Sequence, residues 1–310
     1  MLRIRVLGYD YVMKKLLPPP ELFPSVLGIP YDQFKKLLPL FSQELRKAEL
    51  VRHVKEGERK RPYGAGRRAT FSTDEDKLFF ILFYYKVYPT YRLAEYVLGL
   101  DHTNIQRWKE FLEDVLNRAL GYELKLPEKT VRCLDQLIQV CPQLSECIVD
   151  ATERPVRRPK DPEDETKYFS GKRMDHTVKN QILINPRSKK ILHVSKMSEG
   201  KKHDKKVFEE EAIWMKAPPG TKALGDSAYI GIEKLSPYIK LFRPFKKPVG
   251  GELTPAQKET NRILSSTRVR VENVFGYMKH FNILRHDFRN RLDKAQMPFE
   301  TIACIYNFTR

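Results

Sequence analysis

Long apolar runs and cysteines are both scarce in this sequence, and each scarcity excludes a class of protein. No run approaches the roughly 18 apolar residues that a membrane-spanning helix needs, so we expect no span. The N-terminal stretch MLRIRVLGYDYVMKKLL lacks a long apolar core and a small-residue cleavage site, so we expect no secretory signal. The 4 cysteines form no Cys-x-x-Cys pair, which argues against a zinc site. We therefore expect reduced, mostly buried thiols in an intracellular protein.

The composition is that of a folded, strongly basic protein. The chain has 310 residues, 41% of them hydrophobic, with 17 Phe and 15 Tyr, enough for the core of one large domain or two ordinary ones. Its 57 Lys and Arg outnumber 39 Asp and Glu, which gives a net charge of +18. Such a chain is attracted to polyanions, of which nucleic acid is the commonest. A basic protein with no nucleic-acid role is the alternative.

The first part of the chain reads as helix followed by a basic loop. Residues 1–50 look largely helical and amphipathic, and Pro39 predicts a kink or two short helices. Residues 51–72 are rich in Lys, Arg and Gly and predict a flexible loop. The loop is either a solvated linker or a segment that follows a phosphate backbone. Its candidate DNA contacts are Arg61, Arg67 and Arg68.

Residues 73–122 predict a helical block. Thr73 caps a long apolar helix that runs through Tyr85. A helix over 91–97, a turn at Gly99 and a second helix capped by Asp101 then resemble a helix-turn-helix, although any tight helical hairpin looks similar. The second helix is expected to expose side chains of the types that read DNA grooves: His102, Thr103, Asn104, Gln106, Arg107 and Lys109.

Residues 123–144 are a connector, and residues 145–310 change to an α/β pattern. Short apolar strands end at Asp150 and Asp226, and two further strands surround the turn at Pro186. Helices are expected over 204–214, 263–281 and 295–308, after a Pro- and Gly-rich excursion over 243–262. This order predicts an α/β fold in which helices cover a mixed sheet.

Three carboxylates stand out in this domain. Asp150 and Asp226 each close a buried strand, where ligand sites gather and where an unpaired carboxylate is costly. Either residue alone is more often a turn or helix-cap Asp. In the helix SSTRVRVENVFGYMKHF, Arg268, Glu272 and Lys279 form a charged stripe beside an apolar one.

The charged stripe has two interpretations. Arg268 and Glu272 could be a simple ion pair on a solvated helix face, worth about 0.3 kcal/mol. Three converging carboxylates instead suit hard divalent cations, and two such ions about 4 Å apart can stabilise the attacking and leaving oxygens of a phosphodiester. Arg268 and Lys279 would then balance charge or hold phosphate.

Several motifs follow one another along the chain: the segments 61–68, 77–90, 149–155, 168–172 and 176–179, Gly200 with His203-Asp204, Gly225-Asp226-Ser-Ala-Tyr229, and Arg268, Glu272 and Lys279. In this order they resemble the motifs of DDE insertion-sequence transposases of the bacterial group related to Harbinger-type elements. The resemblance covers roughly residues 30–308, and Ser265 departs from it, standing where the family has Tyr.

The resemblance implies an RNase H-like catalytic domain, with helices on both faces of its sheet, behind an all-helical, helix-turn-helix N-terminal domain. Asp150, Asp226 and Glu272 are the implied triad for two Mg²⁺ ions, which Mn²⁺ can replace. Water would cut the element end, and the freed 3′-hydroxyl would attack target DNA. The implied partners are double-stranded DNA, with its terminal inverted repeats and target, and a second copy in a synaptic homodimer. The expected location is cytoplasmic and nucleoid-associated if the source is bacterial.

Further residues are expected near the DNA, and two rival functions stay open. Lys172, Arg158 and Lys179 are candidate phosphate contacts. His203 and Asp204 either begin a helix, with Asp204 as its cap, or lie near the metals or the DNA. The rivals are a catalytically inactive DNA-binding protein derived from a transposase and a nuclease that cuts without joining.

Overall fold

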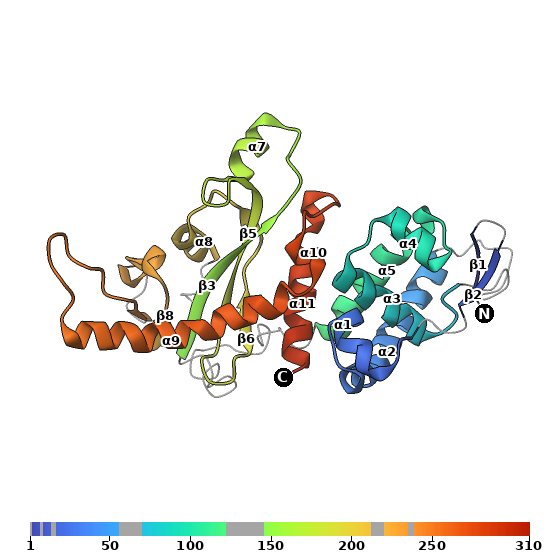
Figure 1. Cartoon of the computed structure of the whole chain (residues 1–310), viewed down its shortest axis with the longest axis horizontal. Helices are drawn as coiled ribbons and strands as arrows, with labels where there is room; N and C mark the ends of the chain where they lie inside the picture. The colour runs from blue at the N-terminus through green and yellow to red at the C-terminus, as the bar shows by residue number, and fades with distance from the viewer. Residues whose placement is uncertain are drawn as a thin grey trace. The chain divides into compact units, whose positions relative to one another are not determined.

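A computed structural model describes residues 2–6, 9–13, 17–55, 70–121, 146–211, 220–234 and 239–310. The chain forms two compact units, drawn in Figure 1. The first comprises the described residues of Met1–Glu123 with His280–Ile283 and Thr309. The second comprises the described residues of Leu124–Lys279 with Leu284–Phe308 and Arg310. The connector predicted over 123–144 lies outside the described residues.

The first unit begins with a β-hairpin, so the prediction of an all-helical N-terminal domain is wrong at this end. Strands β1 (Leu2–Val6) and β2 (Tyr9–Met13) pair antiparallel, with Val6 opposite Tyr9. The cause is visible in the sequence, since β-branched and aromatic residues alternate there with a period of two. A helical interpretation of 1–50 holds only beyond this hairpin.

The rest of the first unit is helical. Its helices are η1 (Pro20–Leu22), α1 (Phe23–Leu27), α2 (Tyr31–Lys55), α3 (Asp74–Val87), α4 (Tyr91–Leu98) and α5 (His102–Leu120). Helix α2 is continuous over 25 residues although Pro39 lies inside it, so the alternative of two short helices is wrong. Thr73 and Asp76 form the capping box that starts α3.

The predicted pair of helices around Gly99 is present. Gly99 ends α4 with a φ of 64°, a left-handed conformation that glycine adopts without strain. Asp101 then caps α5 by accepting a hydrogen bond from the backbone N–H of Thr103. The turn between the helices therefore forms from local chemistry that the sequence displays.

Lys109 is buried, which corrects the prediction that it is exposed. It lies on the same face of α5 as Ile105 and Leu112, both buried in the core. Its Nζ is 2.6 Å from Oε2 of Glu113, whose other oxygen accepts a hydrogen bond from the Tyr85 hydroxyl. Lys109 is thus a structural cation of the helical core.

The second unit is built on a mixed sheet, as predicted, and the described residues contribute seven strands to it. The strands are β3 (Glu146–Pro155), β4 (Phe169–Ser170), β5 (Asp175–Ile184), β6 (Ile191–Val194), β7 (Ser198–Glu199), β8 (Thr221–Leu224) and β9 (Ile239–Phe242). Their order is β4-β5-β3-β8-β9, and β6 and β7 also pair with β5. Strand β3 is antiparallel to β5 and parallel to β8, and β8 is parallel to β9.

Helices cover both faces of this sheet. They are α7 (Pro162–Tyr168), α8 (Asp204–Glu211), α9 (Pro255–Met278), α10 (Asn282–Arg285) and α11 (Gln296–Phe308), with short η4 (Ser227–Tyr229), η5 (Ile232–Lys234) and η6 (Leu292–Lys294). Cys147 and Val149 of β3 pack in a cluster with Phe208 of α8. Asp150 faces the other way, because side chains alternate along a strand, and it meets Arg268 of α9. Figure 1 shows α9 running across the sheet.

Helix α9 begins earlier than predicted. The sequence pattern placed 243–262 in an excursion and started the helix at Ile263, whereas the helix starts at Pro255. Thr254 and Gln257 form a capping box, and Pro at the first helical position suits a helix start. Helix α11 agrees with its prediction. Both described cysteines, Cys147 and Cys304, are buried thiols, as expected.

A buried arginine ties the central strand to the last helix. Arg154 of β3 is 2% exposed and donates hydrogen bonds to the carbonyl of Ala295 and the side chain of Asn180. Its guanidinium lies 4.8 Å from the centre of the Phe299 ring in α11. Burial lowers the pKa of Arg154.

No described helix combines the length and the apolar character that crossing a membrane requires.

The buried ion pair of the first unit gives a stability prediction. Glu113→Ala leaves the ammonium of Lys109 buried without its counter-ion, so we expect the free energy of unfolding to fall by about 3 kcal/mol or more. Urea unfolding followed by circular dichroism measures it. Glu75→Ala is the control, because it breaks the exposed Lys35–Glu75 pair and should cost less than about 1 kcal/mol. Equal losses in the two variants would contradict the role assigned to Lys109.

Candidate active site

Asp150 lies in the middle of β3, not at the end of a strand as predicted. The apolar run stops at Val149, but the strand continues to Pro155 because residues 150–155 keep their pairing with β5, from Ile182 to Thr177. The Asp150 side chain is 17% exposed. One of its oxygens accepts a hydrogen bond of 2.9 Å from the backbone N–H of Ala151. The central strand thus holds a largely buried carboxylate.

Asp226 follows β8 at the level of Asp150. In the parallel pairing Ile148 lies opposite Leu224, and each Asp comes two residues later on its own strand. Asp226 caps the short helix η4 by accepting a hydrogen bond of 2.7 Å from the N–H of Ala228. The parallel register therefore brings the two carboxylates to one place on the sheet.

The electrostatics of Asp150 agree with this placement. Its pKa is raised to about 6, chiefly by burial and to a smaller extent by the neighbouring carboxylates Asp226 and Asp204. The hydrogen bond from Ala151 and the charge of Arg268 act in the opposite direction. The nearest cation is Arg268, whose guanidinium nitrogen is 3.9 Å from the Asp150 carboxylate. The site thus concentrates negative charge that one partly buried arginine offsets.

Glu272 lies on the predicted stripe of α9, and its carboxylate does not form a close group with both aspartates. It is one turn beyond Arg268 on the same side of the helix, and its side chain is exposed. Within the described part of the chain, the oxygens of Asp150, Asp226 and Glu272 form no group whose members all lie within 4.8 Å. The stripe therefore faces the site through Arg268, while Glu272 remains in solvent.

Lys179 is engaged by protein groups, which corrects its assignment as a phosphate contact. Its side chain is 8% exposed, and its Nζ lies 2.8 Å from Asp204 and 3.7 Å from Glu153. It also donates a hydrogen bond of 2.6 Å to the carbonyl of Lys202. Two carboxylates and a carbonyl thus surround the buried ammonium of Lys179 and occupy its hydrogen-bonding positions.

Asp204 is the first residue of α8 rather than its cap. The side chain of His203 accepts a hydrogen bond from the N–H of Lys205, so His203 caps the helix. The Asp204 carboxylate turns instead to Lys179 and contributes to the raised pKa of Asp150. The pair therefore begins α8, with His203 rather than Asp204 as the cap, and a position of either residue near metals or DNA stays a prediction.

The other predicted contacts differ in their surroundings. Lys172 is exposed, and Arg158 is exposed and pairs with Glu165 at 2.7 Å. Burial lowers the pKa of Lys279, and so does the nearby Arg173. The loop residues Arg61, Arg67 and Arg68 lie outside the described residues.

Gln181 and Tyr229 support the site and were missed as functional residues. The amide of Gln181 donates hydrogen bonds to the Tyr229 hydroxyl, at 2.7 Å, and to the carbonyl of Asp204. Tyr229 is fully buried, and its ring leaves no room for a Cβ at Gly225, only 2.9 Å away. Together they fix the turn that carries Asp226. The signal in the sequence was a glutamine inside the apolar strand KNQILI.

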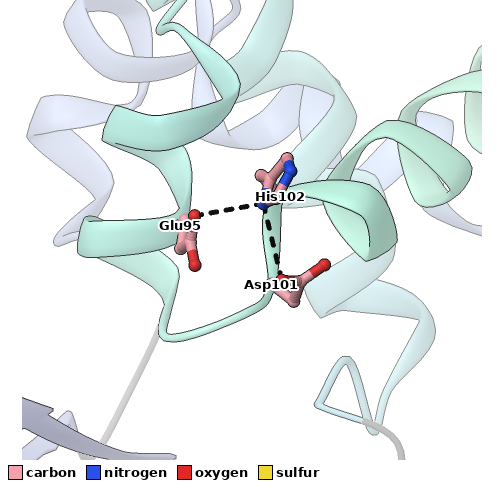
Figure 2. Close-up of side chains that lie close together, drawn as sticks. All are labelled: Glu95, Asp101 and His102. Carbon is pink, nitrogen blue, oxygen red and sulfur yellow. Dashed lines mark ion pairs between the residues drawn. The ribbon is translucent and has the colours of Figure 1, made fainter.

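The first unit presents the predicted groove-reading residues and a separate acidic cluster. Asn104, Gln106 and Arg107 are all exposed on α5. Figure 2 shows His102 between Glu95 and Asp101, with its Nδ1 3.4 Å from each carboxylate. A hydrogen bond from Thr103 lowers the pKa of Asp101. The cluster is explained by local capping and ion pairing at the α4–α5 turn.

Burial of Asp150 predicts a gain in stability when its charge is removed. Because the pKa of Asp150 is raised in the fold, its ionised form destabilises the metal-free protein. This loss of stability is absent at pH values below the ordinary pKa of 3.8, grows as the pH rises, and is constant above about pH 6. We expect Asp150→Asn to raise the free energy of unfolding by up to about 3 kcal/mol near pH 8 and by about 1 kcal/mol near pH 4.5. Urea unfolding in EDTA measures this, and a loss of stability at pH 8 would contradict it.

Comparisons with known proteins agree with the motif order. Residues 149–307 match the family model described as DDE superfamily endonuclease. The chain is 30% identical over 276 residues to the "Probable transposase for insertion sequence element IS702" of Microchaete diplosiphon, covering 89% of this chain and 94% of that one. It is also 30% identical over 162 residues to the "Putative transposase for insertion sequence element IS112" of Streptomyces albus G, covering 52% and 57%.

No solved structure matches the chain significantly. The family match spans half of the chain and both aspartates of the sheet, and the first relative is similar over nearly its whole length. This protein belongs to the DDE superfamily endonucleases, in the branch of insertion-sequence transposases.

Proposed function

We propose that this protein cuts DNA at the ends of a mobile element and joins the freed ends to target DNA, using divalent ions held by Asp150, Asp226 and Glu272. The observation that supports it most is the register of β3 and β8, which sets Asp150 beside Asp226. The proposal includes an RNase H-like arrangement of the sheet and its helices.

The residues of the site fit a hard divalent cation. Asp150 is a largely buried carboxylate whose pKa is raised by burial and by two neighbouring carboxylates. Such a site gains from a bound cation, because the ion replaces the lost hydration and offsets the repulsion. Oxygen ligands of this kind suit Mg²⁺, and Mn²⁺ should substitute for it.

Glu272 completes the proposed ligand set from α9. It lies one turn from Arg268, which already reaches Asp150, and its exposed side chain is free to turn toward the sheet. When bound, two ions would activate the attacking oxygen and stabilise the leaving oxygen of the phosphodiester. Arg268 would release Asp150 and pair with phosphate, and Lys279 would add positive charge farther along the stripe.

The first unit is proposed to recognise the element's ends. Asn104, Gln106 and Arg107 are exposed near the start of α5 and would meet base edges in the major groove. The basic residues Arg61, Arg67 and Arg68 would follow the phosphate backbone, and Lys172 and Arg158 would hold phosphates near the carboxylates. Two ends must be held together, so we propose a homodimer, working at the nucleoid of a bacterial host.

Two other functions would use the same fold. A transposase-derived binding protein would hold DNA without cutting it, and an endonuclease would cut without joining. The buried and electrostatically costly Asp150 argues against the first, because a protein that only binds DNA has no use for it. Joined products distinguish the transposase from the endonuclease.

The triad predicts the behaviour of three variants. Asp150→Ala, Asp226→Ala and Glu272→Ala should each abolish Mg²⁺-dependent nicking and joining of DNA from the element's flanks, because a metal ligand is lost, while DNA binding persists. Gel analysis of cleaved and joined strands, with and without EDTA, measures this. Glu259→Ala, at an exposed glutamate more than three turns before Glu272 on α9, is the control and should retain activity. Full activity in any triad variant would refute that residue's assignment.

A further inference from the structure

The segment after β9 carries a cluster of cations, and none of the described acidic residues pairs with them. Arg243, Lys246 and Lys247 follow Lys240 within eight residues, and none of the four forms an ion pair or side-chain hydrogen bond with the described residues. Lys240, Lys246 and Lys247 are exposed. The acidic residue that follows, Glu252, pairs with Lys258 at 3.2 Å. The segment therefore presents positive charge that no described residue offsets.

This segment leaves the sheet directly beside Asp226. Leu224 of β8 lies opposite Phe242 of β9, and the N–H of Gly225 donates a hydrogen bond of 3.1 Å to the Phe242 carbonyl. Arg243 directly follows Phe242, and Asp226 directly follows Gly225. The cations from Arg243 onward thus begin at the end of β9, beside the end of β8 that leads to Asp226, a proposed metal ligand.

Asn261 of α9 holds the segment in place. Its side-chain oxygen accepts a hydrogen bond of 2.7 Å from the N–H of Phe245, and its amide donates one of 3.0 Å to the Phe245 carbonyl. Asn261 is seven residues before Arg268, so it lies on the same stripe of α9 as Arg268 and Glu272. A merely solvated basic loop has no need of such a two-point clamp.

We propose that residues 243–247 bind the sugar-phosphate backbone of the DNA strand that enters the active site, with Asn261 as the positioning residue. The proposal rests on the proposed function for its substrate, DNA. The cations would pair with phosphates beside the reacting one. Exposed Phe242 and Phe245, at 44% and 46%, flank Arg243 and offer rings on which an unpaired base can stack. Figure 1 shows this loop at the N-terminal end of α9.

The test uses the full-length protein and the salt dependence of DNA binding. The variant is Lys246→Gln with Lys247→Gln, and the control is Lys189→Gln with Lys190→Gln. The control lysines lie in the turn between β5 and β6, which adjoins the start of β3 and so the opposite end of the sheet from Asp226. The probe is a fluorescent duplex from the DNA that flanks this chain's coding sequence, titrated in EDTA at several salt concentrations.

The expected result is a change in slope. Each lost phosphate contact makes the negative slope of log affinity against log salt shallower by about 0.9. The slope of the loop variant should therefore be shallower by about 2, and the slope of the control should not change. Asn261→Ala should weaken binding several-fold with the slope kept, because the cations remain but must be ordered on binding. Equal slopes for the wild type and the loop variant would overturn the proposal.

Failure of this proposal is separable from failure of the proposed function. If the wild type nicks and joins DNA but the loop variant keeps its slope, the loop assignment is wrong and the transposase assignment stands. If the wild type never cuts while the loop variant loses slope, the loop binds DNA and the protein is a binder.

Discussion

The pairing of β3 with β5 on one side and with β8 on the other is the constraint on which the second unit depends. The antiparallel partner keeps β3 extended past Asp150, where the apolar run has already ended. The parallel partner brings Asp226 to the same level. A slip of one residue in either pairing would turn Asp150 away from α9 and into the cluster around Phe208. The pairing register of the sheet therefore also decides where the carboxylates of the proposed site lie.

Much of this organisation is visible in the sequence, because it follows from local signals. The capping box at Thr73 and the left-handed turn at Gly99 are both of this kind. The order of the motifs also predicts both aspartates as site residues, and this assignment stays a prediction. Burial of Lys109 and Lys179 could not be foreseen in this way, because each is neutralised by a partner whose position only the tertiary fold sets. The hairpin at the N-terminus was readable from its alternation but was interpreted as a helix.

Helix α9 brings several of the proposed roles onto one line. Its stripe runs from Asn261, which holds the loop after β9, through Arg268 at Asp150 to the exposed Glu272. A helix repeats a direction every seven residues, so these roles keep fixed spacings without further support. Ser265 lies between Asn261 and Arg268 and leaves that part of the stripe small and exposed. Movement of α9 along its axis would shift all these groups together.

The buried guanidinium of Arg154 has a consequence for the order of synthesis. Its partners Ala295 and Phe299 come more than a hundred residues later in the chain than Arg154, which lies in the strand at the centre of the sheet. A nascent chain in which residues 295–299 have not yet been made holds this cation in the sheet without the carbonyl and the ring that receive it. The strand that carries Asp150 therefore gains these contacts only after α11 has begun to be synthesised.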